Sequence, residues 1–168
     1  MTETDLHADL AALGIATTLH EHPPVFTVEE SSDLHDAISG LHTKNLFLKD
    51  AGGQFWLVTV RHDLRVDLKA LAGTIGAKKL SFGKAEDMAA LLAISPGAVT
   101  PLAAISDRAG AVRVVLDEAL AGDDMVNVHP LRNTATLGLA GSDLVLALAH
   151  WTHPPLVVAI PEREAVAG

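Results

Sequence analysis

Residues Leu41 to Asp50, which read Leu-His-Thr-Lys-Asn-Leu-Phe-Leu-Lys-Asp, point most directly to the fold. The apolar run Leu46-Phe47-Leu48 inside this stretch is typical of a buried β-strand, and Gly52-Gly53 shortly after it is typical of a hairpin turn. A second strand, Gln54 to Arg61, is therefore predicted to pair with the first. Lys44 precedes the apolar run. Because lysine is rarely buried without a partner or a function, its side chain is expected on an exposed edge or in a pocket.

The segments on either side of this hairpin carry helical and strand patterns in no regular order. Apolar spacing and stop glycines predict helices at residues 4–13, 28–38, 67–72, 85–93 and 142–151, with caps at Thr4, Thr27 and Ser142. Short apolar or β-branched runs predict further strands at residues 15–20, 79–82, 102–106, 112–117, 125–129 and 156–160, and the last of these is expected to be buried. Residues 131–136 are polar and are expected to form a turn. This mixture favours an α+β fold, with a mixed sheet and helices packed around it.

The overall composition is that of a globular protein with a core of its own. A length of 168 residues and an apolar content of 49% fit one domain that spans residues 1–168. No cysteine is present, which excludes a disulfide framework, a cysteine-ligated zinc site and a thiol nucleophile. The first residues lack the features of a signal peptide, and no apolar run approaches the ~18 residues of a membrane span. These features predict a cytoplasmic protein.

Charge is unevenly distributed along the chain. The formal net charge of −9 argues against a general nucleic-acid coat. Between Arg61 and Lys84, however, the basic residues Arg61, Arg65, Lys69, Lys78, Lys79 and Lys84 outnumber the acidic residues Asp63 and Asp67. This strip is either a solvated helix face and loop or a local binding site for phosphates.

The motifs of several enzyme classes are absent from the sequence. It contains no Gly-x-Gly-x-x-Gly or Walker loop, no His-Glu-x-x-His and no Gly-x-Ser-x-Gly. His20 and His22 lie at strand spacing on one face, but two histidines alone do not make a metal site, so neither a metal nor a cofactor is predicted. The residues that remain as candidates for chemistry are Lys44, Asn45, the loop Gly97 to Pro101 and His129.

Four motifs follow one another along the chain. They are His22-Pro-Pro-Val-Phe-Thr27, Thr43-Lys-Asn-Leu-Phe-Leu48, Gly97-Ala-Val-Thr-Pro101, and Asn127-Val-His-Pro130 with Asn133-Thr-Ala-Thr136. In this order they resemble the motifs of the YbaK/ProX family of aminoacyl-tRNA deacylases. The likeness extends from about His20 to Ile160 and is strongest for the freestanding prolyl-tRNA editing proteins, which remove alanine from tRNA for proline. It implies a compact mixed α/β fold similar to the editing insertion of bacterial prolyl-tRNA synthetases.

The resemblance also implies roles for individual residues. Lys44 matches the essential lysine of the family, and Asn45 follows it as in the editing members. Gly97 and Pro101 match the ends of a Gly-x-x-x-Pro loop whose backbone amides approach the aminoacyl ester, and His129 matches a histidine of the substrate pocket. By the same likeness, the further residues expected to bind substrate are His22, Thr43, Ala98, Val99 and Thr100.

Elementary chemistry is compatible with these roles. Ester hydrolysis places negative charge on the carbonyl oxygen, so the site needs donors aimed at that oxygen and a water held in place. Amides around Gly97 could supply the donors. Lys44 could position the terminal phosphate or the carbonyl, which is the preferred role, or act as a base if its amine were neutral. His129 is either a satisfied histidine at a strand end or part of the pocket wall or a proton relay. The ribose 2′-hydroxyl of the tRNA could assist.

The sequence therefore predicts trans-acting hydrolysis of the aminoacyl ester of mischarged tRNA, with alanine on tRNA for proline as the first choice. A synthetase site built for proline cannot strongly reject the smaller alanine, because a missing methylene changes binding by only ~1–3 kcal/mol. Clearance of cysteine or serine from tRNA is an alternative within enzymes, and a non-catalytic tRNA-binding module is an alternative outside them.

The predicted partner is the acceptor end of aminoacyl-tRNA, with no membrane involved. Arg61, Lys78 and Lys79 are the candidates for contacting the tRNA through phosphates and base edges. A transient association with prolyl-tRNA synthetase is also compatible with the resemblance.

Overall fold

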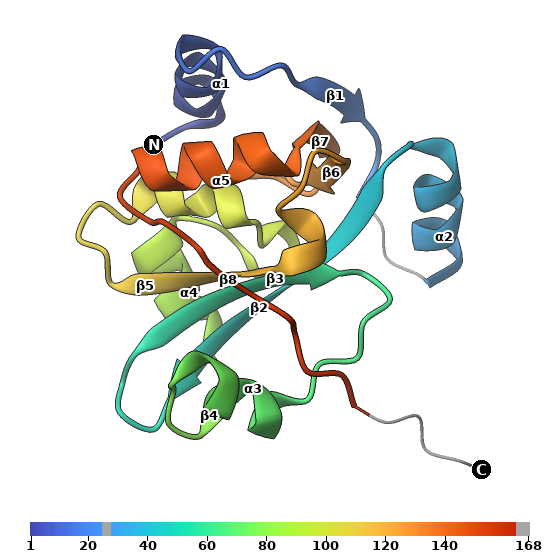
Figure 1. Ribbon diagram of the computed structural model, residues 1–168. Coiled ribbons are helices and arrows are strands. Elements are labelled where there is room, and N and C mark those ends of the chain that lie inside the picture. Colours follow the sequence, from blue (N-terminus) through green and yellow to red (C-terminus); the bar gives the residue numbers. More distant parts are fainter. Residues whose placement is uncertain (25–27, 164–168) are drawn as a thin grey trace.

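A mixed β-sheet forms the centre of the molecule (Figure 1). A computed structural model describes residues 1–24 and 28–163, without the side chains of residues 28–31. Within these residues the sheet has eight strands, in the order β1-β7-β6-β2-β3-β5-β8, and β4 also pairs with β2. The strands are β1 Thr18–Glu21, β2 Leu41–Asp50, β3 Phe55–Arg61, β4 Leu80–Phe82, β5 Val112–Asp117, β6 Met125–Val128, β7 Ala135–Ala140 and β8 Leu156–Val158. The predicted mixed sheet is thereby confirmed.

The predicted hairpin is the centre of this sheet. Strands β2 and β3 pair antiparallel from Thr43 opposite Arg61 to Lys49 opposite Phe55. β2 also pairs antiparallel with β4 and, over two residue pairs only, parallel with β6. β3 pairs parallel with β5. The hairpin therefore joins an antiparallel part of the sheet to a parallel part.

Five α-helices pack around the sheet in the described part of the chain. They are α1 Glu3–Ala12, α2 Val28–Ala37, α3 Leu68–Ile75, α4 Ala85–Leu92 and α5 Gly141–His150. Figure 1 shows α1 and α5 together at one end of the molecule, α3 beside β4 at the opposite end, and α2 to one side, where the chain enters β2. No helix among the described residues is long and apolar enough to cross a membrane.

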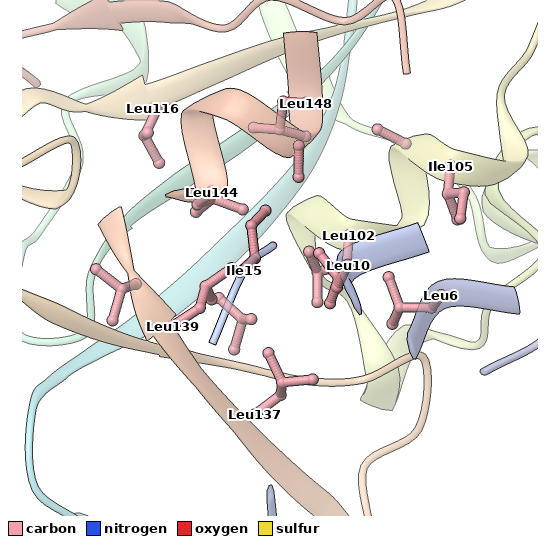
Figure 2. Close-up of a cluster of buried hydrophobic side chains, with 14 of the residues drawn as sticks. Leu6, Leu10, Ile15, Leu102, Ile105, Leu116, Leu137, Leu139, Leu144 and Leu148 are labelled. Carbon is pink, nitrogen blue, oxygen red and sulfur yellow. The ribbon is translucent and has the colours of Figure 1, made fainter. Parts of the chain in front are cut away.

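Three clusters of buried apolar side chains hold the helices on the sheet. The largest contains leucines of α1, β7 and α5, including Leu10, Leu137 and Leu144 (Figure 2). On β2, Leu48 belongs to a second cluster with α3, whereas its neighbour Phe47 belongs to a third cluster with α4. Because both faces of β2 are covered, its apolar run is continuous rather than alternating.

Two predicted helix caps differ from the structure. α1 begins after Thr2, whose Oγ1 accepts from the Asp5 amide at 3.2 Å, while the Asp5 carboxylate accepts from the Thr2 amide at 2.8 Å. This reciprocal pair takes the place of the predicted cap at Thr4. α5 follows Ala140 as its N-cap instead of Ser142. The cap predicted at Thr27 lies outside the described residues.

Several predicted elements also differ from the structure. The segment predicted as a strand at 102–106 belongs to a buried 3₁₀ helix, Pro101–Ser106, because Thr100 Oγ1 caps it by accepting from the Leu102 amide. Strand β7 includes residues 135 and 136, which were predicted to form a turn. α3 continues past Gly73 and ends at Gly76, which adopts a left-handed conformation. The last strand, β8, is partly exposed instead of buried.

Candidate functional site

A cavity of about 280 Å³ lies where strands β2 and β6 separate. The two strands pair only at Leu41 with Val126 and at His42 with Asn127. Beyond these pairs, β2 stays with β3, and the edge of β2 that faces β6 is open until it pairs with β4 from Leu48 onward. The wall of the cavity consists of Leu34, His35, His42, Thr43, Lys44, Asn45, His62, Asn127, Val128, His129 and Thr136. The site is therefore built by residues of α2, the β2–β3 hairpin and the β6–β7 pair.

Lys44 occupies a special position in this wall. Its side chain is partly buried and lines both the cavity and a neighbouring groove. Among the described residues, no carboxylate forms an ion pair with its ammonium group. An ammonium group carries three hydrogen-bond donors and a full positive charge. Lys44 can therefore offer both to an anionic or carbonyl group of a ligand.

Asn45, the next residue on β2, is engaged on both sides of its amide. Its Nδ2 donates to the carbonyl oxygen of Val99 at 3.0 Å, and its Oδ1 accepts from Thr59 Oγ1 at 2.6 Å. Thr59 is fully buried. Asn45 therefore holds the segment around Val99 against the hairpin and defines one edge of the cavity.

Thr43 and Asn127 join the two strands at the base of the cavity. Thr43 Oγ1 donates to the backbone carbonyl of Asn127 at 2.8 Å. The Asn127 side chain donates through Nδ2 to the carbonyl oxygen of Ser39 at 2.9 Å. These bonds maintain the contact between β2 and β6 at the point where their backbone pairing ends.

His129 stands at the end of β6 and presents a neutral imidazole. Its Nδ1 lies 3.1 Å from the carbonyl oxygen of Ala135 and must donate, because a carbonyl oxygen can only accept. Burial lowers the pKa of His129 below its usual value, and the hydrogen bond to Ala135 opposes this shift only in part. The neutral ring with its proton on Nδ1 leaves Nε2 as a hydrogen-bond acceptor.

His22 lies one hydrogen bond behind the wall. Its Nδ1 donates to the carbonyl oxygen of Pro23 at 2.8 Å, so its Nε2 accepts from the hydroxyl of Thr136 at 2.9 Å. Thr136 lines the cavity, whereas His22 does not. His22 therefore acts on the cavity by orienting Thr136.

Three more histidines form one side of the wall. The rings of His35 and His42 stack with centroids 4.2 Å apart, and His62 meets His35 edge to face at 4.5 Å. Burial, reinforced by the nearby His42 and His62, lowers the pKa of His35 to about 4. No group of three metal-ligating side chains converges among the described residues. This side of the wall therefore presents flat imidazole surfaces.

Comparison with known proteins identifies the family of this chain. The aminoacyl-tRNA editing domain family matches residues 22–146, a range that contains every residue of the cavity wall. The chain belongs to this editing family. The match confirms the resemblance drawn from the four sequence motifs.

Relatives and solved structures agree with this membership. The prolyl-tRNA synthetase associated domain-containing protein 1 of Bos taurus is 40% identical over 158 residues, which cover 91% of this chain and 92% of that protein. The prolyl-tRNA editing protein ProX of Acetoanaerobium sticklandii is 41% identical over 138 residues, covering 82% and 84%. A solved structure of a candidate trans-editing enzyme for prolyl tRNA synthetase has the same fold, with a TM-score of 0.72 at 22% identity over 96% of this chain and 97% of that one.

Within this editing fold, part of the predicted site comes together. Thr43, Lys44, Asn45 and His129 all line the cavity, although His129 is 84 or more residues away from the other three in sequence. His22 reaches it through Thr136. The roles of these residues toward a substrate remain predictions, but their side chains meet at one place.

The predicted loop from Gly97 to Pro101 lies outside the cavity wall. The Val99 carbonyl is bonded to Asn45, and the Ala98 amide donates to the Ser95 carbonyl at 3.0 Å. Thr100 and Pro101 are buried. Gly97 faces Asn133, since a Cβ at Gly97 would lie 3.1 Å from Asn133 Nδ2. The loop therefore supports the wall from behind, and the catalytic role of Gly97 stays a prediction.

The three predicted tRNA contacts lie at two separate places, with Arg61 at one end of the hairpin and the neighbouring residues Lys78 and Lys79 at the other. The Arg61 Nε forms an ion pair with Asp117 at 3.1 Å, and this bond raises the pKa of Arg61. The Lys78 amide donates to Asp50, at the far end of β2, and Lys79 follows it. Because Asp50 is six residues beyond Lys44, this end of the strand lies about 20 Å from the cavity. A direct role of these residues in binding tRNA remains a prediction.

Sequence reasoning missed one side of the wall. Leu34, His35, His42 and His62 were not predicted to belong to the site, whereas Asn127, Val128 and Thr136 occur in the motifs that carried the resemblance. The sequence did contain a pattern that indicates two of these residues. The hairpin register places His62 beside His42, whose carbonyl accepts from the His62 amide at 3.0 Å. Two histidines paired across the hairpin next to Lys44 would have pointed to this wall.

Proposed function

We propose that this protein hydrolyses the aminoacyl ester of mischarged tRNA in trans, and that alanine on tRNA for proline is its first substrate. The observation that supports this proposal most is Lys44, a partly buried cation with no carboxylate partner among the described residues, on the wall of a small cavity. Membership of the aminoacyl-tRNA editing family supplies the substrate class. We propose that it acts in the cytoplasm.

The size of the cavity supports a small amino acid. A volume of about 280 Å³ is just below the range of about 300–1,000 Å³ that is usual for small-molecule pockets. An alanyl group and one or two water molecules fit such a space, since a water takes about 30 Å³. The bulkier prolyl ring leaves less room for the attacking water. Exclusion by size would then protect correctly charged tRNA.

The chemistry needs a water that attacks the ester carbon and a proton for the departing ribose oxygen. The Lys44 ammonium group donates to the carbonyl oxygen, or to the terminal phosphate, and stabilises the charge that develops there. The neutral Nε2 of His129 accepts a hydrogen bond from the water or from the amino group of the substrate. The bond between the carbonyl carbon and the ribose oxygen then breaks, and the vicinal 2′-hydroxyl can assist in proton transfer. The products are free alanine and uncharged tRNA.

Single-turnover release of alanine tests this proposal. Alanyl-tRNA for proline is mixed with excess protein in the presence of a chelator, with prolyl-tRNA as the substrate control. Lys44→Ala is compared with the wild type and with Arg113→Ala, which removes an exposed cation that lies over Trp56, away from the cavity. We expect rapid loss of alanine alone, abolished by Lys44→Ala and retained by Arg113→Ala. Absence of release from alanine, serine and cysteine esters would overturn the proposal and leave a binding module.

Serine is the second candidate substrate, and a specific feature favours it. The cavity wall carries the hydroxyls of Thr43 and Thr136, which could satisfy the hydroxyl of a seryl group. A comparison of alanyl, seryl and cysteinyl esters on the same tRNA separates these substrates. A lower rate for the seryl ester than for the alanyl ester is the outcome that our first choice requires.

The name of the bovine relative also suggests a partner. We propose a transient association with prolyl-tRNA synthetase, in which the editing protein receives mischarged tRNA as it leaves the synthetase. Co-sedimentation of the two proteins with and without tRNA tests this association.

A further inference from the structure

A second concave surface adjoins the cavity and shares Lys44 with it. This groove, of about 560 Å³, lies between β2, the segment that leads into α3, the end of β4 and the C-terminal segment. It is lined by Lys44, Leu46, Arg65, Val66, Asp67, Leu68, Phe82 and Arg163. Side chains alternate along a strand, so Lys44 and Leu46 point to the same face of β2, the face that α3 covers. The groove and the cavity are therefore continuous at Lys44.

The groove is positively charged although the protein is acidic as a whole. Its lining contains the three cations Lys44, Arg65 and Arg163, and one acidic residue, Asp67. The Asp67 carboxylate is already engaged, because it caps α3 by accepting from the Ala70 amide at 3.1 Å. No described carboxylate forms an ion pair with Arg65 or Arg163. The groove therefore complements an anionic ligand.

The backbone holds the two arginines next to each other. The Arg163 amide donates to the Arg65 carbonyl at 2.7 Å, and the Asp67 amide donates to the Pro161 carbonyl at 2.9 Å. Val66 and Glu162 form a β-bridge between these two bonds. The two guanidinium groups thus come from neighbouring backbone segments that are far apart in sequence, and both line the groove.

Phe82 provides an open aromatic face in the same groove. Its side chain is 66% exposed, the highest value among the exposed large apolar residues. Its backbone is nevertheless held in place, because Phe82 pairs with Leu48 and the following Gly83 amide donates to the Phe47 carbonyl at 2.8 Å. An aromatic ring held beside cations is the combination with which proteins bind single-stranded nucleic acids, through base stacking and phosphate contacts.

We infer that this groove binds the unpaired nucleotides that precede the ester-bearing nucleoside at the 3′ end of tRNA. Phe82 stacks on one of their bases, and Arg65 and Arg163 contact their phosphates, which directs the terminal nucleoside to Lys44 and the cavity. Leu48, the partner of Phe82, lies four residues beyond Lys44 on β2. This separation of about 13 Å along the strand is comparable to the length of a few stacked nucleotides, at about 3.4 Å for each step. The inference rests on the proposed function for the identity of the ligand.

Binding of a short RNA tests the groove without any hydrolysis. The probe is the single-stranded tetranucleotide 5′-ACCA-3′ with a fluorescent 5′ label, and anisotropy is measured at several salt concentrations. We expect Phe82→Ala to weaken binding about tenfold and Phe82→Trp to restore it. The double change Arg65→Ala and Arg163→Ala should weaken binding and lower the salt slope by about 0.7 for each phosphate that is no longer neutralised.

Two matched variants serve as controls. Arg113→Ala removes one exposed cation away from the groove, and Leu146→Ala removes an apolar side chain of α5 that is 48% exposed. Both should bind the tetranucleotide like the wild type. If the wild type does not bind it, or if the double arginine variant binds it equally well with the same salt slope, the inference is wrong.

A comparison of two esters connects the groove with catalysis. Alanyl-tRNA for proline reaches the groove, whereas 2′(3′)-O-alanyladenosine has no preceding nucleotides and occupies the cavity alone. The groove variants should lower kcat/KM for the tRNA about tenfold and leave hydrolysis of alanyladenosine unchanged. An equal loss with both esters would contradict the inference. If the wild type hydrolyses neither ester, the proposed function fails. Tetranucleotide binding alone then tests whether the groove binds single-stranded RNA.

Discussion

Asn45 on strand β2 donates through its Nδ2 to the carbonyl oxygen of Val99 at 3.0 Å, so that a side chain at the edge of the cavity holds a segment more than fifty residues away. The same amide accepts from the fully buried Thr59 at 2.6 Å. The two hydrogen bonds of Asn45, the residue next to Lys44, therefore connect the hairpin with the Gly97 to Pro101 loop.

Asn45→Ala should destabilise the protein by about 1–3 kcal/mol, because it leaves the Thr59 hydroxyl and the Val99 carbonyl without their partner. Urea unfolding measures this loss. Thr59→Val is the matched variant, since it removes one of the two bonds and leaves the link to Val99 intact. Activity should fall more in Asn45→Ala than in Thr59→Val if the link to Val99 shapes the cavity. Equal activities would show that the link is dispensable.

Lys44→Met should retain the fold and lose activity. The side chain has no carboxylate partner among the described residues, so its removal breaks no ion pair in this part of the protein. Loss of a donor aimed at a developing negative charge typically lowers the rate by about 10²–10³-fold. Lys44→Arg separates the two roles of the lysine, because an arginine can position an anion but cannot act as a base. Partial activity with an unchanged pH profile supports positioning, whereas complete loss in a folded protein supports the base.

The protein should become less stable as the pH falls from about 6.5 to about 4, in part because of His35. The pKa of His35 is lowered to about 4, mainly by burial and further by His42 and His62, while Asp36 opposes the shift. In the unfolded chain the residue takes up its proton near pH 6.5. The unfolded state therefore binds more protons between these values, and the stability that is present above pH 6.5 is lost on the way to pH 4.

His35→Phe isolates this contribution. The variant keeps an aromatic ring in the stack with His42 and removes the titrating group. Urea unfolding at pH 7.0, 6.0 and 5.0 should show a smaller loss of stability with falling pH in the variant than in the wild type. His7→Phe, on α1 and away from the cluster, is the control. The same pH dependence in His35→Phe and in the wild type would contradict the assignment.

Gly141 and Gly73 should respond in opposite directions to alanine. A Cβ at Gly141 would overlap the Leu120 carbonyl oxygen and lie 2.8 Å from that of Gly122, so Gly141→Ala should cost about 3 kcal/mol. A Cβ at Gly73 would have no atom within 4 Å, and Gly73 lies inside α3, so Gly73→Ala should add about 0.5–1 kcal/mol. Chemical denaturation of both variants checks the pair. A stable Gly141→Ala protein would contradict the close approach of α5 to Leu120.

The elements that could be predicted from the sequence are those specified by neighbouring residues. The β2–β3 hairpin follows from the apolar run at Leu46 and the glycines at 52 and 53, and it is present in the structure. The segment 102–106 was predicted as a strand, because a short apolar run is compatible with either a strand or a buried helix. In the structure, the cap at Thr100 begins a 3₁₀ helix there. Strand β7 was not predicted, and the polar residues Asn133 and Thr134 made its first two residues look like part of a turn.

The sequence by itself determined the family, the mixed α/β class and the placement of Lys44 at the start of a buried strand, because local patterns and ordered motifs carry that information. The tertiary structure alone decided where the cavity lies. It forms where β2 leaves β6, after two residue pairs that each join positions 85 residues apart in the chain. The groove likewise unites Arg65, Phe82 and Arg163 only after the C-terminal segment has paired with Val66. Such contacts depend on how distant strands register with one another, and no local pattern specifies that register.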